Sequence, residues 1–267
     1  MNKINGGKDP LMKKCLGKLA LELAAVLLGT MCATAPSRAD VIFSGSGVSG
    51  NTNNTVSAQV TFSVLPGNVL EVVLENTSPN PEAIRRGDIL TGVIWDMKGT
   101  DPALSGLATS LTAGSNIYTN ANTINNATSL VNKWAFKGMP GGPYTYSNNS
   151  ATFEYGISTI GGGVFPGGSV HGDDYGLVAN AGSLDNPSFS ASAFPLIVNT
   201  LTFNLNGFTS SLDNIENVKF TYGSGPNFVL PGPKNTVPEP SSFVLAGIGM
   251  TLGALGWHRR RKLSRAS

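Results

Sequence analysis

Apolar and polar side chains alternate with a period of two in several short segments of this chain. The alternation is clearest over residues 58–64, and after a Pro-Gly-Asn sequence it resumes over residues 70–75. Because successive side chains of a β-strand point to opposite faces, this pattern predicts a hairpin with one buried and one solvated face. Further strands are predicted where the same or a weaker pattern occurs: residues 89–95, 152–157, 201–205 and 218–222.

The composition agrees with many short strands joined by turns. The 267 residues include 33 Gly and 16 Pro, and no segment between residues 40 and 236 shows a helical stripe over ten residues. Glycine and proline favour turns and interrupt helices, which argues against a helical bundle. We therefore expect an all-β domain over residues 40–222, built as an antiparallel β-sandwich with jelly-roll-like connections.

Charged residues are segregated along the chain. Eleven of the 18 Lys and Arg residues lie in residues 1–39 and 258–267, whereas 14 of the 16 Asp and Glu residues lie between these two ends. The central part thus carries a net charge of about −7. Binding to a phosphate backbone needs clustered Lys and Arg, so this acidic centre argues against a nucleic-acid partner.

The first 39 residues are typical of a secretory signal peptide. Basic residues precede an apolar stretch over residues 19–31, and the preferred cleavage site follows Ala39, which leaves Asp40 as the new N-terminus. Residues 33–35 offer a second site, but Pro36 would then follow the cut directly. Export by this route requires the secretion translocon and signal peptidase.

Both cysteines, Cys15 and Cys32, lie within this predicted leader. The exported part is therefore expected to contain no disulfide, no thiolate ligand and no thiol nucleophile. A lipoprotein attached through Cys32 is an alternative, although residues 29–31 match the usual lipoprotein signal poorly.

The other end of the chain carries three features in order. Pro238, Glu239 and Pro240 come first, followed by an apolar run over residues 243–257 and then by a basic cluster. The cluster consists of Arg259, Arg260, Arg261 and Lys262. The apolar run is at the short limit for a transmembrane helix, and the basic cluster is expected to stay in the cytoplasm. Residues 223–236, which are rich in Pro and Gly, predict an extended linker before these features.

This order resembles the PEP-CTERM sorting signal of exosortase-dependent bacterial surface proteins, with residues 237–267 as the signal. The resemblance implies that exosortase, an integral-membrane enzyme, recognises Pro238, Glu239 and Pro240 and processes the tail. It also implies transient residence in the inner membrane, followed by the cell surface or extracellular matrix of a Gram-negative bacterium. Such proteins are often associated with exopolysaccharide and biofilm.

Parts of the central domain carry a second resemblance. Residues 90–96, 134–138 and 175–178 are similar to short sequence segments in a group of exosortase-dependent surface proteins. This similarity supports the limits of the domain but implies no activity.

One polar, glycine-rich segment is a candidate for chemistry. His171 is the only histidine before the C-terminal segment, and it is followed by Asp173 and Asp174. A histidine and a carboxylate can activate a serine, but no Gly-x-Ser-x-Gly sequence supplies one. The two aspartates are also a candidate calcium site, although the spacing of a calcium loop is missing. We expect a solvated loop here, with no catalytic role and no cofactor.

Trp95, Trp134 and Tyr175 are candidates for a ligand-binding surface, because flat rings stack on sugar faces. The same residue types fill protein cores, and packing is the simpler interpretation. The sequence thus favours an exported, non-enzymatic β-domain with a structural or adhesive role. A carbohydrate-binding module for surface polysaccharide is the main alternative, and a hydrolase comes third.

Overall fold

The computed structural model describes most of the central part of the chain. The described residues are 40–49, 52–79, 85–120, 122–139, 141–145, 151–160, 165, 172, 174–185, 194–223 and 228–235. The predicted leader up to Ala39 and the predicted transmembrane helix at residues 243–257 lie outside these ranges. No helix within the described ranges has the length and hydrophobicity needed to cross a membrane.

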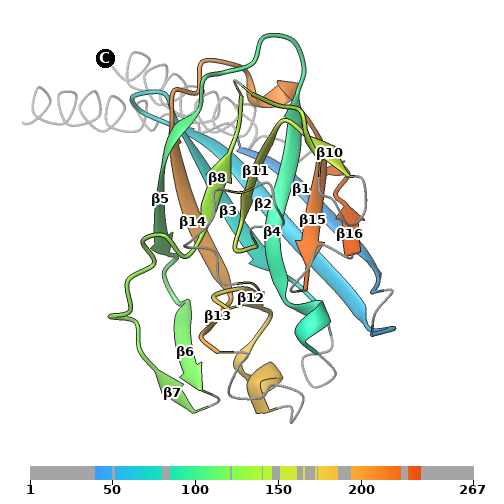
Figure 1. The fold of residues 1–267 in the computed structure, drawn as a ribbon, viewed down its shortest axis with the longest axis vertical. Coiled ribbons are helices and arrows are strands. Elements are labelled where there is room, and N and C mark those ends of the chain that lie inside the picture. Colours follow the sequence, from blue (N-terminus) through green and yellow to red (C-terminus); the bar gives the residue numbers. More distant parts are fainter. Residues whose placement is uncertain are drawn as a thin grey trace, which may run out of the picture. The chain divides into compact units, whose positions relative to one another are not determined.

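Six of the described strands form the first sheet, in the order β17-β1-β2-β3-β14-β5, and every neighbouring pair is antiparallel. Figure 1 shows β1, β2, β3, β14 and β5 of this sheet. They are β1 (Asp40–Val48), β2 (Thr55–Leu65), β3 (Val69–Asn76), β5 (Ser105–Leu111), β14 (Thr200–Asn206) and β17 (Lys234–Asn235). The predicted hairpin is confirmed, because Leu65 of β2 pairs with Val69 of β3. Gly67 and Asn68 between them adopt left-handed φ angles of 85° and 60°, which Gly and Asn tolerate best.

Nine described strands form the second sheet. Its main order is β16-β15-β4-β12-β13-β6-β7, and β11 pairs with both β4 and β8. They are β4 (Leu90–Met97), β6 (Asn116–Asn120), β7 (Thr123–Ile124), β8 (Ala135–Lys137), β11 (Tyr155–Ser158), β12 (Leu177–Val178), β13 (Leu196–Val198), β15 (Ile215–Tyr222) and β16 (Phe228–Pro231). The pairs are antiparallel except for β12 with β13.

Shorter elements complete the described part. A separate hairpin pairs β9 (Tyr144–Thr145) with β10 (Thr152–Phe153). Short 3₁₀ helices lie at Arg86–Asp88, Ala181–Asp185 and Leu212–Asn214. The all-β, predominantly antiparallel class predicted from the sequence is therefore confirmed for the described residues.

The two sheets pack face to face around one hydrophobic core. Phe62 of β2 meets Trp95 of β4 edge to face, with ring centroids 5.4 Å apart. Every second side chain of β3 is buried, as the alternation predicted, and Leu70, Val72 and Leu74 lie in this core. Burying one large apolar side chain stabilises a fold by roughly 1.5–3 kcal/mol, so this shared core is the main reason that the two sheets stay together.

β4 runs through the middle of the second sheet and is buried on both faces. Trp95 packs into the shared core, whereas Ile94 packs on the opposite face against Phe153 and Phe165. At Gly92 a Cβ would lie only 2.7 Å from a carbonyl oxygen of β11 and from a hydroxyl of β15. Glycine at this position therefore allows both neighbouring strands to approach β4 closely.

The C-terminal part of the domain differs from the sequence prediction. β16 pairs with β15 and β17 pairs with β1, so residues 228–235 belong to the two sheets and do not form an extended linker. Pro231 at the end of β16 and Pro233 just before β17 are compatible with this arrangement, because both strands lie at sheet edges. The connections also differ from a jelly roll, since β1, β2 and β3 are neighbours both in sequence and in the sheet.

Candidate functional site

The three aromatic residues considered for a ligand-binding surface lie in the core. Trp95 is 0% exposed, and its ring contacts Phe62 on one side and stacks on Tyr155 at 5.9 Å. Trp134 and Tyr175 are 3% and 7% exposed. The structure thus places all three rings among core neighbours and does not bring them together on an exposed surface.

The polar, glycine-rich segment lies largely outside the described residues. Asp174 is described and is partly buried, whereas His171 and Asp173 are not described. Within the described ranges, no three His, Cys, Asp or Glu side chains are grouped so that they could hold a metal ion. Because one of its two aspartates is not described, the calcium site at Asp173 and Asp174 stays a prediction.

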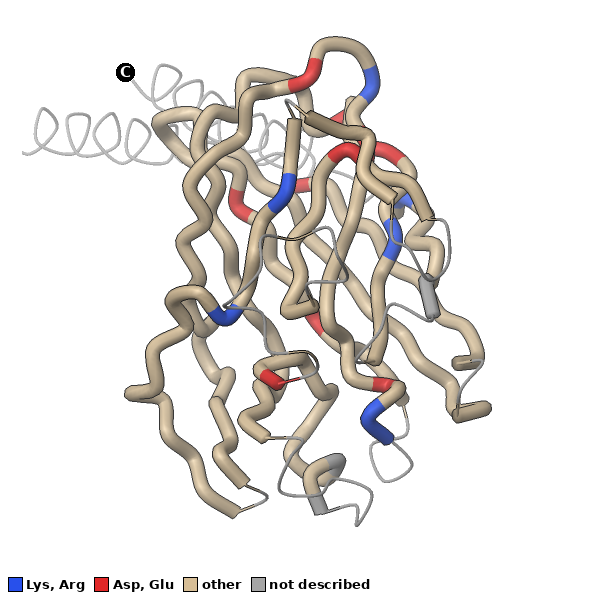
Figure 2. Tube along the Cα trace, in the orientation of Figure 1, with Lys and Arg blue, Asp and Glu red and all other residues tan. Residues whose placement is uncertain are grey.

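Several acidic residues lie at one end of the fold, where β4 ends (Figure 2). Glu154 Oε2 accepts a hydrogen bond from Met97 N at 2.7 Å, and Glu154 N donates to Asp96 Oδ1 at 3.0 Å. Burial raises the pKa of Glu154 and outweighs the bond from Met97, and the charges of Asp101, Asp96 and Glu216 raise that pKa further. These contacts join the ends of neighbouring strands, which is a structural use of the carboxylates.

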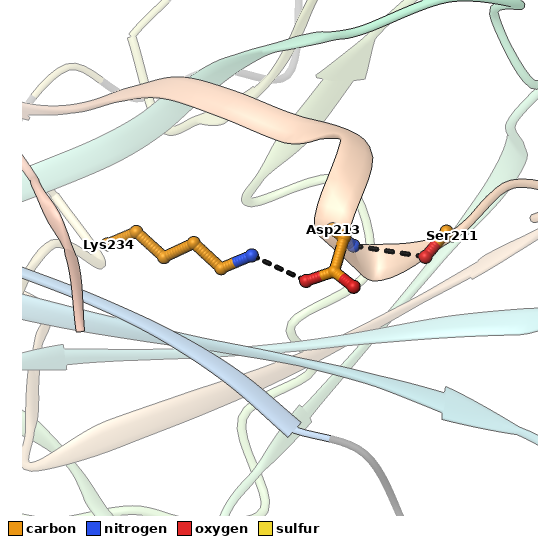
Figure 3. A network of polar contacts seen from close by, with 3 residues as sticks. All are labelled: Ser211, Asp213 and Lys234. Carbon is orange, nitrogen blue, oxygen red and sulfur yellow. Dashed lines mark hydrogen bonds and ion pairs between the residues drawn. The ribbon is translucent and has the colours of Figure 1, made fainter. Parts of the chain in front are cut away.

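β17 fixes the point at which the chain leaves the described fold. Lys234 and Asn235 pair with β1, and the Asn235 side chain donates a hydrogen bond to Ser44 Oγ. Figure 3 shows a second attachment, in which Lys234 Nζ lies 2.7 Å from Asp213 Oδ1 and Asp213 N donates to Ser211 Oγ. The last described residue is therefore fastened to the first sheet.

An open groove lies at the other edge of the first sheet, between β5 and the segment that leads into β8. Its volume is about 720 Å³. One wall is formed by Gly106, Leu107, Ala108 and Thr109, and the other by Val131, Asn132, Trp134, Ala135 and Phe136. All of these residues are uncharged, and Val131 is 71% exposed although it is apolar.

This groove was not predicted, although the sequence carries a signal for it. Residues 102–132 contain no Asp, Glu, Lys, Arg or His. The run includes β5, β6 and β7, and these strands are free of charged residues in Figure 2. Such a long uncharged run is notable in a domain that otherwise carries a clear excess of acidic residues.

Comparison with known families identifies the C-terminal end. Residues 236–262 match the family model of the PEP-CTERM protein-sorting motif. No curated protein matches the chain. The match starts at the residue after β17 and includes Pro238, Glu239 and Pro240, so the predicted sorting signal is confirmed. The motif implies export and surface sorting in a bacterium, with exosortase as the processing partner.

Proposed function

We propose that this chain, which carries a PEP-CTERM sorting motif over residues 236–262, is a bacterial surface protein whose β-sandwich acts as a structural or adhesive module. The observation that carries the proposal is the junction itself: the motif follows directly on a two-sheet fold. The folded domain is then the cargo, and the motif delivers it.

The use of polar groups within the domain supports a non-enzymatic role. Asp96 and Glu154 bond to neighbouring strands, and Asp88 is wholly buried and bonds to a loop. A catalytic carboxylate needs access to a substrate. These three carboxylates are instead engaged in holding strands and loops together.

We also propose the individual steps of delivery. We place the chain first in the inner membrane through residues 243–257, with Arg259, Arg260, Arg261 and Lys262 on the cytoplasmic side. Exosortase then processes the tail, and the domain reaches the cell surface or the extracellular matrix of a Gram-negative bacterium.

Binding of surface polysaccharide is a second candidate function with one observation in its favour. Trp134 lines the uncharged groove beside β5, and its Nε1 has no hydrogen-bond partner among the described residues. Its ring is only 3% exposed, however, so a sugar could not stack on it without a rearrangement. For this reason we rank the structural role first.

Replacing Glu239 with glutamine tests the sorting step in the full chain. Glutamine keeps the size of the side chain but removes the charge between the two prolines. In a bacterium that has exosortase, we expect the variant to remain uncleaved in the inner membrane, with at least a tenfold lower surface fraction. Cell fractionation and mass spectrometry of the C-terminus measure both effects.

Glu216→Gln provides the matched control, because Glu216 is an exposed glutamate of the folded domain. This control should be cleaved and delivered like the unchanged chain. Normal cleavage and delivery of Glu239→Gln would overturn the proposed sorting.

A further inference from the structure

The edges of the two sheets are not equally protected. β17, at one edge of the first sheet, is two residues long and contains Lys234 next to Pro233. In the second sheet, β16 ends at Pro231, β7 has two residues, and β8 has three residues including Lys137. Short length, lysine and proline are devices that prevent an edge strand from pairing with another chain. β5, with seven residues, has none of these three, and its only such feature within the described ranges is a bulge at its start.

β5 presents backbone groups that can accept another strand. One side of β5 pairs with β14, and the other side pairs with no strand within the described ranges. In an antiparallel strand, alternate residues direct their N–H and C=O groups to each side, so half of these groups face outward. A bulge at Gly106, with φ at 66°, interrupts the start of the strand and leaves residues 107–111 as its regular part.

The side chains of β5 would allow another strand to approach it closely. Ala108 and Ser110 are small and exposed, whereas Leu107 and Leu111 pack against the core and hold the strand in place. The exposed Val131 lies across the adjoining groove. A strand added at this edge would therefore gain backbone hydrogen bonds and also cover apolar surface.

The charge distribution makes β5 the place at which two copies of the chain can meet with the least repulsion. Residues 40–235 contain seven Lys and Arg but 13 Asp and Glu, so two copies repel each other over much of their surface. β5 and its neighbour β14 contain no charged residue, and residues 102–132 around β5 contain none either. Two copies that meet at β5 therefore place no like charges opposite each other.

We propose that β5 is the docking strand for a second copy of this chain, which pairs its own β5 in antiparallel fashion about a two-fold axis near Ala108. The same strand serves on both partners, as a two-fold interface requires. The pairing joins two six-stranded sheets into one continuous sheet. This inference rests on the proposed structural function, for which it supplies the assembly step.

Single cysteines in β5 test the pairing directly. The only cysteines are Cys15 and Cys32, so the full chain with both replaced by serine has no other thiol. Ala108, Thr109 and Ser110 are each changed to cysteine in this background. Residues that face each other across an antiparallel pair lie about 4.5–5.5 Å apart, within reach of a disulfide. We expect mild oxidation to convert most of at least one variant into a covalent dimer.

Ala103→Cys is the matched control, because Ala103 is equally classed as exposed but precedes β5. Its two copies would lie on the order of 30 Å apart in the proposed dimer, so it should remain monomeric. If no β5 cysteine forms dimers above the level of this control, the proposal is wrong.

A pair of oppositely charged variants distinguishes loss of dimer pairing from loss of folding. Ala108→Glu or Ala108→Lys alone opposes two like charges, and each should lower the dimer fraction at least tenfold in sedimentation velocity of the purified full chain in detergent. An equimolar mixture of the two variants should restore the dimer. A folded mixture that stays monomeric would overturn self-pairing. The measurement uses purified protein and does not depend on sorting. The Glu239→Gln variant should therefore still form the dimer, so a failure of delivery can be told apart from a failure of assembly.

Discussion

Asp88 is a buried carboxylate whose hydrogen bonds connect the two sheets. It is 0% exposed, and its Oδ2 accepts hydrogen bonds from Asn54 Nδ2 at 2.6 Å and from Arg85 N at 3.0 Å. Its Oδ1 accepts a further bond from Thr52 Oγ1. These bonds tie the loop before β2 to the 3₁₀ helix before β4. A buried carboxylate is tolerated only while its oxygens accept hydrogen bonds. Removing the carboxylate would in turn leave the buried donors without an acceptor.

We expect Asp88→Ala to lower the free energy of unfolding by about 3 kcal/mol, because it leaves three donors without their acceptor. Asp88→Asn keeps one acceptor oxygen and should cost less. Denaturant unfolding of the purified chain measures both changes. Asp213→Ala is the control: its carboxylate forms an ion pair with Lys234, but the side chain is 82% exposed. That pair contributes at most about 1 kcal/mol, so equal losses at Asp88 and Asp213 would contradict the argument.

At the scale of elements, β1 and β16 approach each other where Gly45 has no side chain. A Cβ at Gly45 would overlap the carbonyl oxygen of Pro231. Because that oxygen belongs to the backbone of a paired strand, it cannot rotate away as a side chain can. We expect Gly45→Ala to destabilise the fold by about 1–3 kcal/mol and to speed hydrogen exchange in β16.

Ser46→Ala controls for this change, because Ser46 is the next residue of β1 and is exposed. Its effect on stability should stay within about 0.5 kcal/mol. An equally small effect of Gly45→Ala would mean that β16 can shift without cost.

The elements differ in how well the sequence predicts them, and burial explains the difference. β2 and β3 are solvated on one face, so their alternation is visible and their hairpin could be predicted. β4 could be recognised as a strand, but burial on both faces removes the alternation that would locate its inner face. Residues 228–235 resembled a linker because their prolines fit either state. Only pairing with β15 and with the distant β1 decides that they belong to the sheets.

At the scale of the whole molecule, the sorting signal could be predicted and the docking edge could not. The sorting features follow one another within a short stretch, so their order alone identifies them. The β5 edge depends on which strand ends the first sheet, and that is decided by the pairing of β14 with both β3 and β5. The role of Trp95 could not be predicted either, because an indole ring suits a core as well as a ligand-binding surface. Its contacts with Phe62 and Tyr155 show that it belongs to the core.

The folded domain and the sorting motif are joined with almost no spacer. β17 ends at Asn235 and is fastened to β1, and Pro238 follows three residues later. A residue spans at most about 3.6 Å, so Pro238 lies within about 11 Å of Asn235. An enzyme that binds the tripeptide in an extended cleft therefore meets the folded domain, unless β17 first detaches from β1.

Inserting ten flexible Gly and Ser residues after Asn235 should therefore speed processing severalfold, because the enzyme can then bind without displacing β17. Pulse-chase labelling of the full chain in cells with exosortase gives the rate. The same insertion at Gly99, an exposed turn, controls for added length and should leave the rate unchanged. Lys234→Ala should act in the same direction as the spacer but less strongly, since it removes only the ion pair with Asp213. Slower processing with the spacer would instead mean that the enzyme requires contact with the folded edge beside the motif.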